Sequence, residues 1–327
     1  MSPAEPAEYG PTYTKGRSFR ARAEARQRMF RATKLGAACD KWGHLLSPDA
    51  TESGANFIVT EAHDAARDRA AAGKGVALRT FNNMLSSQAM CFNIFAPLAV
   101  DLDLASSALG SFVPQLQRVT AIHIEYTPAK DVFGDQSGRG GVDCDVLVEG
   151  VSTDGDGTVA ILETKFVEPE FSSCSFRNPS RAKEGKSHCP DSLVVTRDGS
   201  NCLYASAKGY GYWQRTLEHK TLRPGLLPGA CPFGGPGWQL WVNHTLAAHE
   251  AKLRGARHGV FGVVAPKNND ALLRDGSVLS SFAEQLTNPD SVLHIDVGDL
   301  VARLAQERTS RWPSSWVSDL VTRYVIE

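Results

Sequence analysis

Apolar and polar positions alternate with a period of two in three consecutive segments near the middle of the chain. The segments are residues 119–128, 142–150 and 159–166, and STDGDGT between the last two is typical of a hairpin turn. A more apolar stretch at residues 86–100 precedes them, with Ser86 and Ser87 as candidate N-caps. The pattern therefore predicts a buried helix followed by three strands.

Further elements are predicted on both sides of this group. An extended arm over residues 1–16 and helices over 15–34 and 53–73 precede it. A proline-containing, loop-like region over 167–199 follows, and then come helices over 206–220 and 238–255, strands starting at 258 and over 292–301, and a closing helix over 316–326.

Composition is that of an ordinary globular protein. The 327 residues are 42% hydrophobic and 22% charged with a formal net charge of −1, so overall charge does not indicate a polyanionic partner. The length suits one large domain or two smaller ones. No window approaches the roughly 18 uninterrupted apolar residues of a membrane span, and seven cysteines without tight pairing do not form a disulfide framework. We expect a cytoplasmic protein with reduced thiols and no membrane association.

Local charge is more informative in residues 15–34, where basic residues recur nearly every third position and Glu24 is the single acid. One interpretation is a solvated helix that packs its few apolar residues. The other is an arm that contacts the phosphates of nucleic acid. Candidate phosphate contacts are Arg17, Arg20, Arg28, Arg31 and Lys34, together with Arg177 and Arg181 further along the chain.

The strand VAILETKF places Glu163 and Lys165 on one face, next to an apolar run. Asp145, near the start of the preceding strand, can lie close to Glu163 across the hairpin. Two neighbouring carboxylates repel each other unless a positive charge lies between them. Mg²⁺, or Mn²⁺ in its place, would meet that need, with the backbone carbonyl of Thr164 as a further ligand.

These residues resemble the motif of the PD-(D/E)xK, or restriction-endonuclease-like, nuclease superfamily. The resemblance rests on DVLVE with Asp145 and on ETK with Glu163 and Lys165, and the element order matches the αβββαβ core of that superfamily. SSQAMCFNIFAPL, IEYTP, ILETKFVEPEFS, YGYWQ and WQLWVNHTLA also resemble an uncharacterised bacterial group within it. The resemblance implies an α/β (α+β) fold in which helices flank a central mixed sheet, with N-terminal helical and C-terminal additions.

The implied domain organisation has three parts. Residues 1–80 form a basic arm with helices, and residues 81–270 form the nuclease core with a loop-rich insertion at about 167–205. Residues 271–327 add a strand and a helix that complete the same domain.

The resemblance also implies the site residues: Asp145, Glu163 and Lys165 as catalytic residues, and Asp145, Glu163 and the Thr164 carbonyl as metal ligands. GVDCD lacks the usual proline before the first aspartate, so Asp143 is a second candidate for that role. Further candidate helpers are Gln88, Glu125 and Gln214, each of which could equally be an ordinary polar surface position.

The later cysteines and histidines are weaker candidates. Ordinary thiols are favoured over a metal or cluster site because no tight C-x-x-C pair occurs; the cysteines concerned are Cys174, Cys189, Cys202 and Cys231. His244 and His249 are five residues apart, which does not match the i, i+4 spacing of two ligands on one helix face.

The sequence thus predicts a Mg²⁺-dependent phosphodiesterase that acts on nucleic acid, with DNA as the first expectation. The alternative is a non-catalytic nucleic-acid-binding or assembly module that retains the fold. DNA or RNA, single or double strands, endo- or exonuclease action, base specificity, biological role and a homodimeric state all remain open.

Overall fold

A computed structural model of the chain describes residues 6–73, 75–129, 132–134, 142–235 and 237–327. Most of the turn-rich stretch GDQSGRGG, at residues 135–141, lies outside the described residues.

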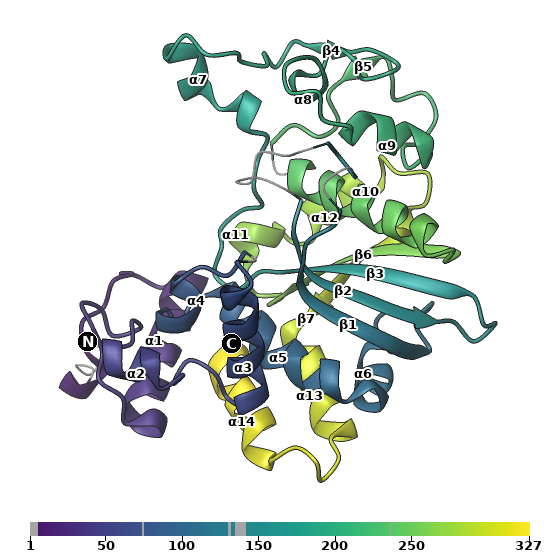
Figure 1. Cartoon of the computed structure of the whole chain (residues 1–327). Helices are drawn as coiled ribbons and strands as arrows, with labels where there is room; N and C mark the ends of the chain where they lie inside the picture. Colours follow the sequence, from purple (N-terminus) through teal and green to yellow (C-terminus); the bar gives the residue numbers. More distant parts are fainter. Residues whose placement is uncertain (1–5, 74, 130–131, 135–141, 236) are drawn as a thin grey trace.

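The centre of the molecule is a five-stranded mixed sheet (Figure 1). Its strand order is β1 (Arg118–Tyr126), β2 (Cys144–Val151), β3 (Gly157–Thr164), β6 (His258–Ala265) and β7 (Val292–Asp296). The first three strands are antiparallel neighbours, whereas β6 and β7 continue the sheet in parallel from β3. The predicted mixed sheet flanked by helices is confirmed, and β3 occupies its middle.

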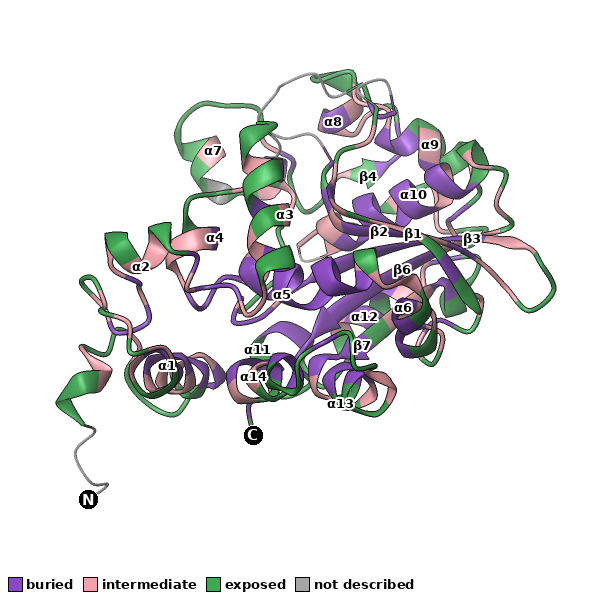
Figure 2. Ribbon diagram, turned by 60° about the horizontal axis from the view of Figure 1, so that its bottom comes forward, coloured by how far each residue is buried: buried purple, intermediate pink, exposed green. Residues whose placement is uncertain are grey.

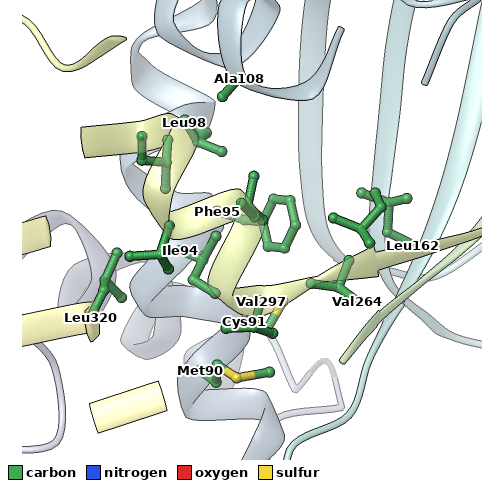
Figure 3. Packing of buried hydrophobic residues seen from close by; sticks show 14 of the residues in the cluster. Met90, Cys91, Ile94, Phe95, Leu98, Ala108, Leu162, Val264, Val297 and Leu320 are labelled. Carbon is green, nitrogen blue, oxygen red and sulfur yellow. The ribbon is translucent and has the colours of Figure 1, made fainter. Parts of the chain in front are cut away.

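One face of the sheet is covered by α5 (Ser87–Val100), α6 (Leu102–Leu109), α13 (Val297–Glu307) and α14 (Ser314–Tyr324). Helix α5 is buried along nearly its whole length, and the Ser86 hydroxyl caps it by accepting a hydrogen bond from the Ala89 amide at 3.3 Å. Figure 3 shows Phe95 of α5 near Leu162 of β3 and Val264 of β6. This apolar face explains why residues 86–100 read as a core helix.

The opposite face is covered by α10 (Gly237–Leu253) and α12 (Ser277–Ala283), and α9 (Tyr212–Glu218) packs against α10. Leu147, Ile161 and Phe261 of the sheet pack against this layer. Trp241 of α10 stacks on Phe233 with ring centroids 4.3 Å apart. Both faces of β3 are therefore buried, and charged residues on it can lie only near its ends.

The N-terminal region packs beside α5 and α14 (Figure 1). It contains η1 (Ala7–Tyr9), α1 (Phe19–Phe30), the π-helical η2 (Arg31–Leu35), α2 (Pro48–Glu52), α3 (Thr60–Ala71) and α4 (Arg79–Asn82). The fully buried Arg323 of α14 donates to Gln27 Oε1 at 3.0 Å and to the Asn56 carbonyl at 2.6 Å. These bonds join the C-terminal helix to the N-terminal region.

The insertion after β3 extends further than the sequence suggested. It contains η3 (Ser175–Arg177), α7 (Pro179–Lys183), β4 (Val194–Val195), α8 (Leu203–Ser206), α9 and β5 (Gly229–Ala230), and α10 returns to the sheet only afterwards. In Figure 2 the strands β2, β3 and β6 are mainly buried, whereas α7 is mainly exposed.

Three predicted boundaries were wrong. The helix expected over residues 53–73 begins only at Thr60. The strand expected over residues 292–301 ends at Asp296, whose carboxylate caps α13 by accepting from the Asp299 amide at 2.9 Å. The helix expected over residues 206–220 begins only at Tyr212. Two further short elements, α11 (Asp270–Leu273) and η4 (Pro289–Ser291), lie between β6 and β7.

In the described part of the chain, no single helix has the length and apolar character to cross a membrane. Helices α5 and α6 would pass that test only as a pair, and they are bent by 119° relative to each other.

Candidate active site

Three carboxylates lie in a row across three neighbouring strands at one end of the sheet. Ile124 and Tyr126 of β1 pair with Val146 and Cys144 of β2, so Glu125 lies opposite Asp145. Val146 pairs with Leu162 of β3, which brings Asp145 opposite Glu163 one step further along. The hairpin register therefore brings together the carboxylates that the sequence singled out.

Asp145 is held by Thr164 and by the core helix α5. Its Oδ2 atom accepts hydrogen bonds from the Thr164 amide and from the Thr164 hydroxyl, both at 2.6 Å. Its backbone carbonyl accepts from Cys91 Sγ at 3.8 Å. Burial, together with the neighbouring Glu163 carboxylate, raises the pKa of Asp145 to about 7. Ionised Asp145 is thus unfavourable unless a positive charge is added nearby.

Glu163 is buried and accepts bonds from three side chains. Lys165 Nζ and Gln239 Nε2 donate to Oε1 at 2.7 and 2.6 Å, and Asn243 Nδ2 donates to Oε2 at 2.7 Å. Burial alone would lower the pKa of Lys165, but the Glu163 and Asp145 carboxylates beside it raise that pKa above its usual range. Glu163 and Lys165 therefore form a shielded ion pair, with side chains 6% and 12% exposed.

Glu125 is the third carboxylate, and its backbone is unusual. It has a φ of 52°, in the left-handed region that non-glycine residues rarely adopt, although it lies within strand β1. Burial and the Asp145 charge raise the pKa of Glu125 to about 8, and a hydrogen bond with Gln88 of α5 opposes that rise. Both Gln88 and Glu125 thus lie beside Asp145.

The remaining sequence candidates lie less centrally. Asp143 is exposed before the start of β2, whereas Asp145 lies opposite Glu163. Gln214 is exposed on α9. The amides that contact Glu163 come instead from α10, which is the next long helix against this face of the sheet.

The sequence reasoning missed two polar residues that contact the motif and one that anchors the chain directly after it. Gln239 and Asn243 are spaced i, i+4 on α10, and that spacing was the available signal. Glu168 accepts from the Phe166 amide and from the Ser87 hydroxyl, both at 2.7 Å, and so anchors the chain after Lys165 to the first turn of α5.

The donor set fits a divalent cation that prefers oxygen ligands. Glu125, Asp145 and Glu163 are mutually repulsive, and Glu125 Oε1 is a buried oxygen without a hydrogen-bond partner. Among the described residues no three acidic, histidine or cysteine side chains already form a ligand shell. Binding would require Glu163 to exchange some of its present bonds for the cation. Thr164, whose carbonyl the sequence suggested as a ligand, ends β3 beside both carboxylates.

Two of the predicted nucleic-acid contacts serve the fold instead. Arg28 and Arg31 are each 3% exposed and donate to backbone carbonyls of the N-terminal region, including those of Tyr9 and Gly43. Their burial argues against a phosphate contact, which the sequence could not show because helical spacing alone does not tell which arginines face inward. Glu24, the single acid of the segment, is also buried and accepts from the Tyr13 and Thr14 amides.

The other basic candidates differ in availability. Arg17 is exposed and Arg20 is half-buried, whereas Lys34 forms an ion pair with Asp319 at 3.2 Å. In the insertion, Arg177 pairs with Asp191 at 3.1 Å, and Arg181 donates to the Ser187 carbonyl and lies over the Phe176 ring.

The four later cysteines are all free thiols within the insertion. Burial raises the pKa of Cys174, and it raises the pKa of Cys231 to about 11. These four cysteines are among the described residues, and within those residues no three histidine, cysteine or acidic side chains are grouped as metal ligands.

Comparison with known proteins gave one match. A family model described as the PD-(D/E)XK nuclease superfamily matches residues 14–192, which include the whole strand trio and the helices before it. No curated protein and no solved structure matches the chain.

Proposed function

The chain belongs to the PD-(D/E)XK nuclease superfamily, and we propose on that basis that it is a metal-dependent nuclease that hydrolyses phosphodiester bonds, foremost those of DNA. The observation that carries the proposal is the row of Glu125, Asp145 and Glu163 with Lys165 beside it. A binding module has no use for buried charges concentrated in this way, because no bound cation offsets the free-energy cost of removing them from water.

Each residue of the row has a proposed task. Asp145 and Glu163 would hold Mg²⁺, or Mn²⁺ in its place, and the Thr164 carbonyl would be a further ligand. When bound, the cation supplies charge neutralisation and polarises the phosphate. The Lys165 ammonium would orient the attacking water and stabilise the negative charge that develops on phosphorus. Gln239 and Asn243 keep the Glu163 carboxylate in one orientation.

The chain contains its own control for the motif. Glu184 and Lys186 form another of the E-x-K sequences in the chain, with a 2.6 Å ion pair. This one lies in the exposed insertion, and its side chains are 53% and 60% exposed. We expect Lys165→Ala to reduce cleavage at least 100-fold, which is about the effect of removing one transition-state donor. Lys186→Ala should cleave within twofold of the parent.

The assay uses linear, circular and single-stranded DNA and RNA, with Mg²⁺ or Mn²⁺ and an EDTA control. Equal cleavage by the parent and Lys165→Ala would show that the residue assignment is wrong. Calorimetry with Mn²⁺ distinguishes a nuclease from a non-catalytic binding module. If the protein is a nuclease, the parent and Glu184→Gln should bind the cation, and Glu163→Gln should not. Absence of Mn²⁺ binding by the parent would favour a non-catalytic nucleic-acid-binding module.

A further inference from the structure

Arg69, in the last turn of α3, has two buried guanidinium nitrogens without partners. Its Nε and Nη2 atoms are both inaccessible to solvent and make no hydrogen bond with any residue that the structure describes. A guanidinium that loses its water without gaining acceptors is unfavourable, and such groups are normally paired. This side chain therefore has the arrangement expected of one that awaits a ligand.

The charged group beside Arg69 is Glu125. The Arg69 charge lowers the pKa of Glu125, although burial and Asp145 outweigh that effect. Yet no hydrogen bond or ion pair joins the two described side chains, and Glu125 Oε1 is itself a buried atom without a partner among the described residues. Two donors of Arg69 and one acceptor of Glu125 are thus unsatisfied within electrostatic range of each other. This suits a phosphate that offers an oxygen to Arg69 and carries a cation that Glu125 contacts.

The end of α3 is held against the carboxylates by the chain that follows it. A side-chain carbon at Gly75 would lie 3.3 Å from Glu125 Oε2 and 3.8 Å from Asp143 Oδ2. Gln88 Nε2 donates to the Gly75 carbonyl at 3.2 Å, and Gln88 Oε1 accepts from the Ala77 amide at 3.2 Å. The core helix α5 thus fixes this segment, and with it the end of α3, over the site.

We propose that Arg69 binds a non-bridging oxygen of the substrate phosphate at the cleavage position. The inference rests on the proposed nuclease function and adds a residue that lies outside the motif strands. A guanidinium suits this task because its planar donors match the geometry of phosphate oxygens and because it is always charged. It would also explain why a basic residue is buried next to a carboxylate without pairing with it.

Arg69→Gln tests the proposal, and Arg67→Gln is the matched control. Arg67 is an exposed arginine on the same helix. Binding of a fluorescein-labelled 20-nucleotide DNA, single-stranded and duplex, is measured by anisotropy with Ca²⁺ over a range of NaCl concentrations. Arg69→Gln should weaken binding about 10- to 100-fold and reduce the slope of log K against log salt by about 0.7–0.9. Arg67→Gln should bind within about twofold of the parent.

Mn²⁺ calorimetry on the same proteins separates phosphate binding from a structural role. Both variants should retain the Mn²⁺ affinity of the parent. Unchanged DNA affinity in Arg69→Gln, or a parallel loss of Mn²⁺ affinity, would overturn the inference. If the parent neither binds nor cuts nucleic acid, the proposed function fails; if the parent and Arg69→Gln bind and cut equally, only the assignment of Arg69 fails.

Discussion

Asp145 on β2 accepts two hydrogen bonds from Thr164 at the end of β3, one from the amide and one from the hydroxyl, each 2.6 Å long. Thr164 is the middle residue of the E-x-K sequence, which the motif leaves unspecified. Its side chain fixes the Asp145 carboxylate relative to Glu163, the residue before it. The central position of the motif therefore orients one acid while its flanking residues supply the other acid and the lysine.

Thr164→Val removes the hydroxyl and keeps the shape of the side chain. We expect Mn²⁺ affinity to fall at least about 10-fold, as when a group that orients a metal ligand is lost. Thr158→Val is the control, because Thr158 lies at the other end of β3 and donates to the Gln115 carbonyl at 2.6 Å. Calorimetry checks the result, and equal Mn²⁺ affinity in the parent and Thr164→Val would contradict it.

The raised carboxyl pKa values predict how stability depends on pH without metal. The pKa rises on folding from 3.8 to about 7 at Asp145 and from 4.5 to about 8 at Glu125. The folded state therefore holds protons that the unfolded chain releases, so these groups reduce stability as pH rises from about 4 to 8. Asp145→Asn removes the part of this pH-dependent loss of stability that comes from the Asp145 carboxyl.

The measurement is urea unfolding in EDTA at pH 5 and pH 8. The free energy of unfolding of Asp145→Asn, relative to that of the parent, should be about 1–2 kcal/mol higher at pH 8 than at pH 5. The buried histidines have lowered pKa values and contribute the opposite slope, but they are common to both proteins and cancel in the difference. A difference that does not change with pH would show that Asp145 is not an unfavourable charge in the folded protein.

Arg323→Met should destabilise the protein by about 2–4 kcal/mol. The change leaves Asn56 Oδ1 and Gln27 Oε1 without their buried donor, and the Asn56 carbonyl keeps only its bond from Asn93 Nδ2. Arg303→Met is the control, because Arg303 forms a half-exposed ion pair with Glu307 on α13 and should cost less than about 1 kcal/mol. The urea midpoint measures both changes, and similar midpoints would refute a special role for Arg323.

Arginines of the basic segment should differ in effect according to whether the side chain faces the protein interior or solvent. Arg28→Ala should lower the free energy of unfolding by about 1–3 kcal/mol, because its guanidinium holds the carbonyls of Tyr9 and Gly10. Its DNA affinity should equal that of the parent. Exposed Arg17→Ala should show the reverse, with unchanged unfolding and a weaker salt dependence of DNA binding. If Arg28→Ala is folded but binds DNA more weakly than the parent, Arg28 contacts phosphate after all.

Much of the fold could be predicted because period and turn chemistry are local. The strand trio and the buried α5 follow from alternation, the turn and the serine cap, and observed ends differ from expected ones by a few residues. The start of α13 was missed because Val297–Val301 is as apolar as a strand, and only the Asp296 cap separates the two elements. The insertion gave no clear period, and its short helices are set by tertiary contacts.

The site was partly predictable for the same reason. A hairpin register relates Asp145 to Glu163 through counting alone. The i, i+4 spacing of Gln239 and Asn243 places both amides on one face of α10, but that they and Arg69 reach the site depends on how α10 and α3 pack. Likewise, Arg28 and Arg17 differ in which way they face, although they belong to one basic run.

Gln239 and Asn243 reach Glu163 from 76 and 80 residues further along the chain. During synthesis the β2–β3 hairpin emerges from the ribosome well before α10 does. At roughly 5–20 residues per second, those 80 residues take roughly 4–16 s. The growing chain thus carries the whole motif for several seconds without the helix that holds Glu163 in place.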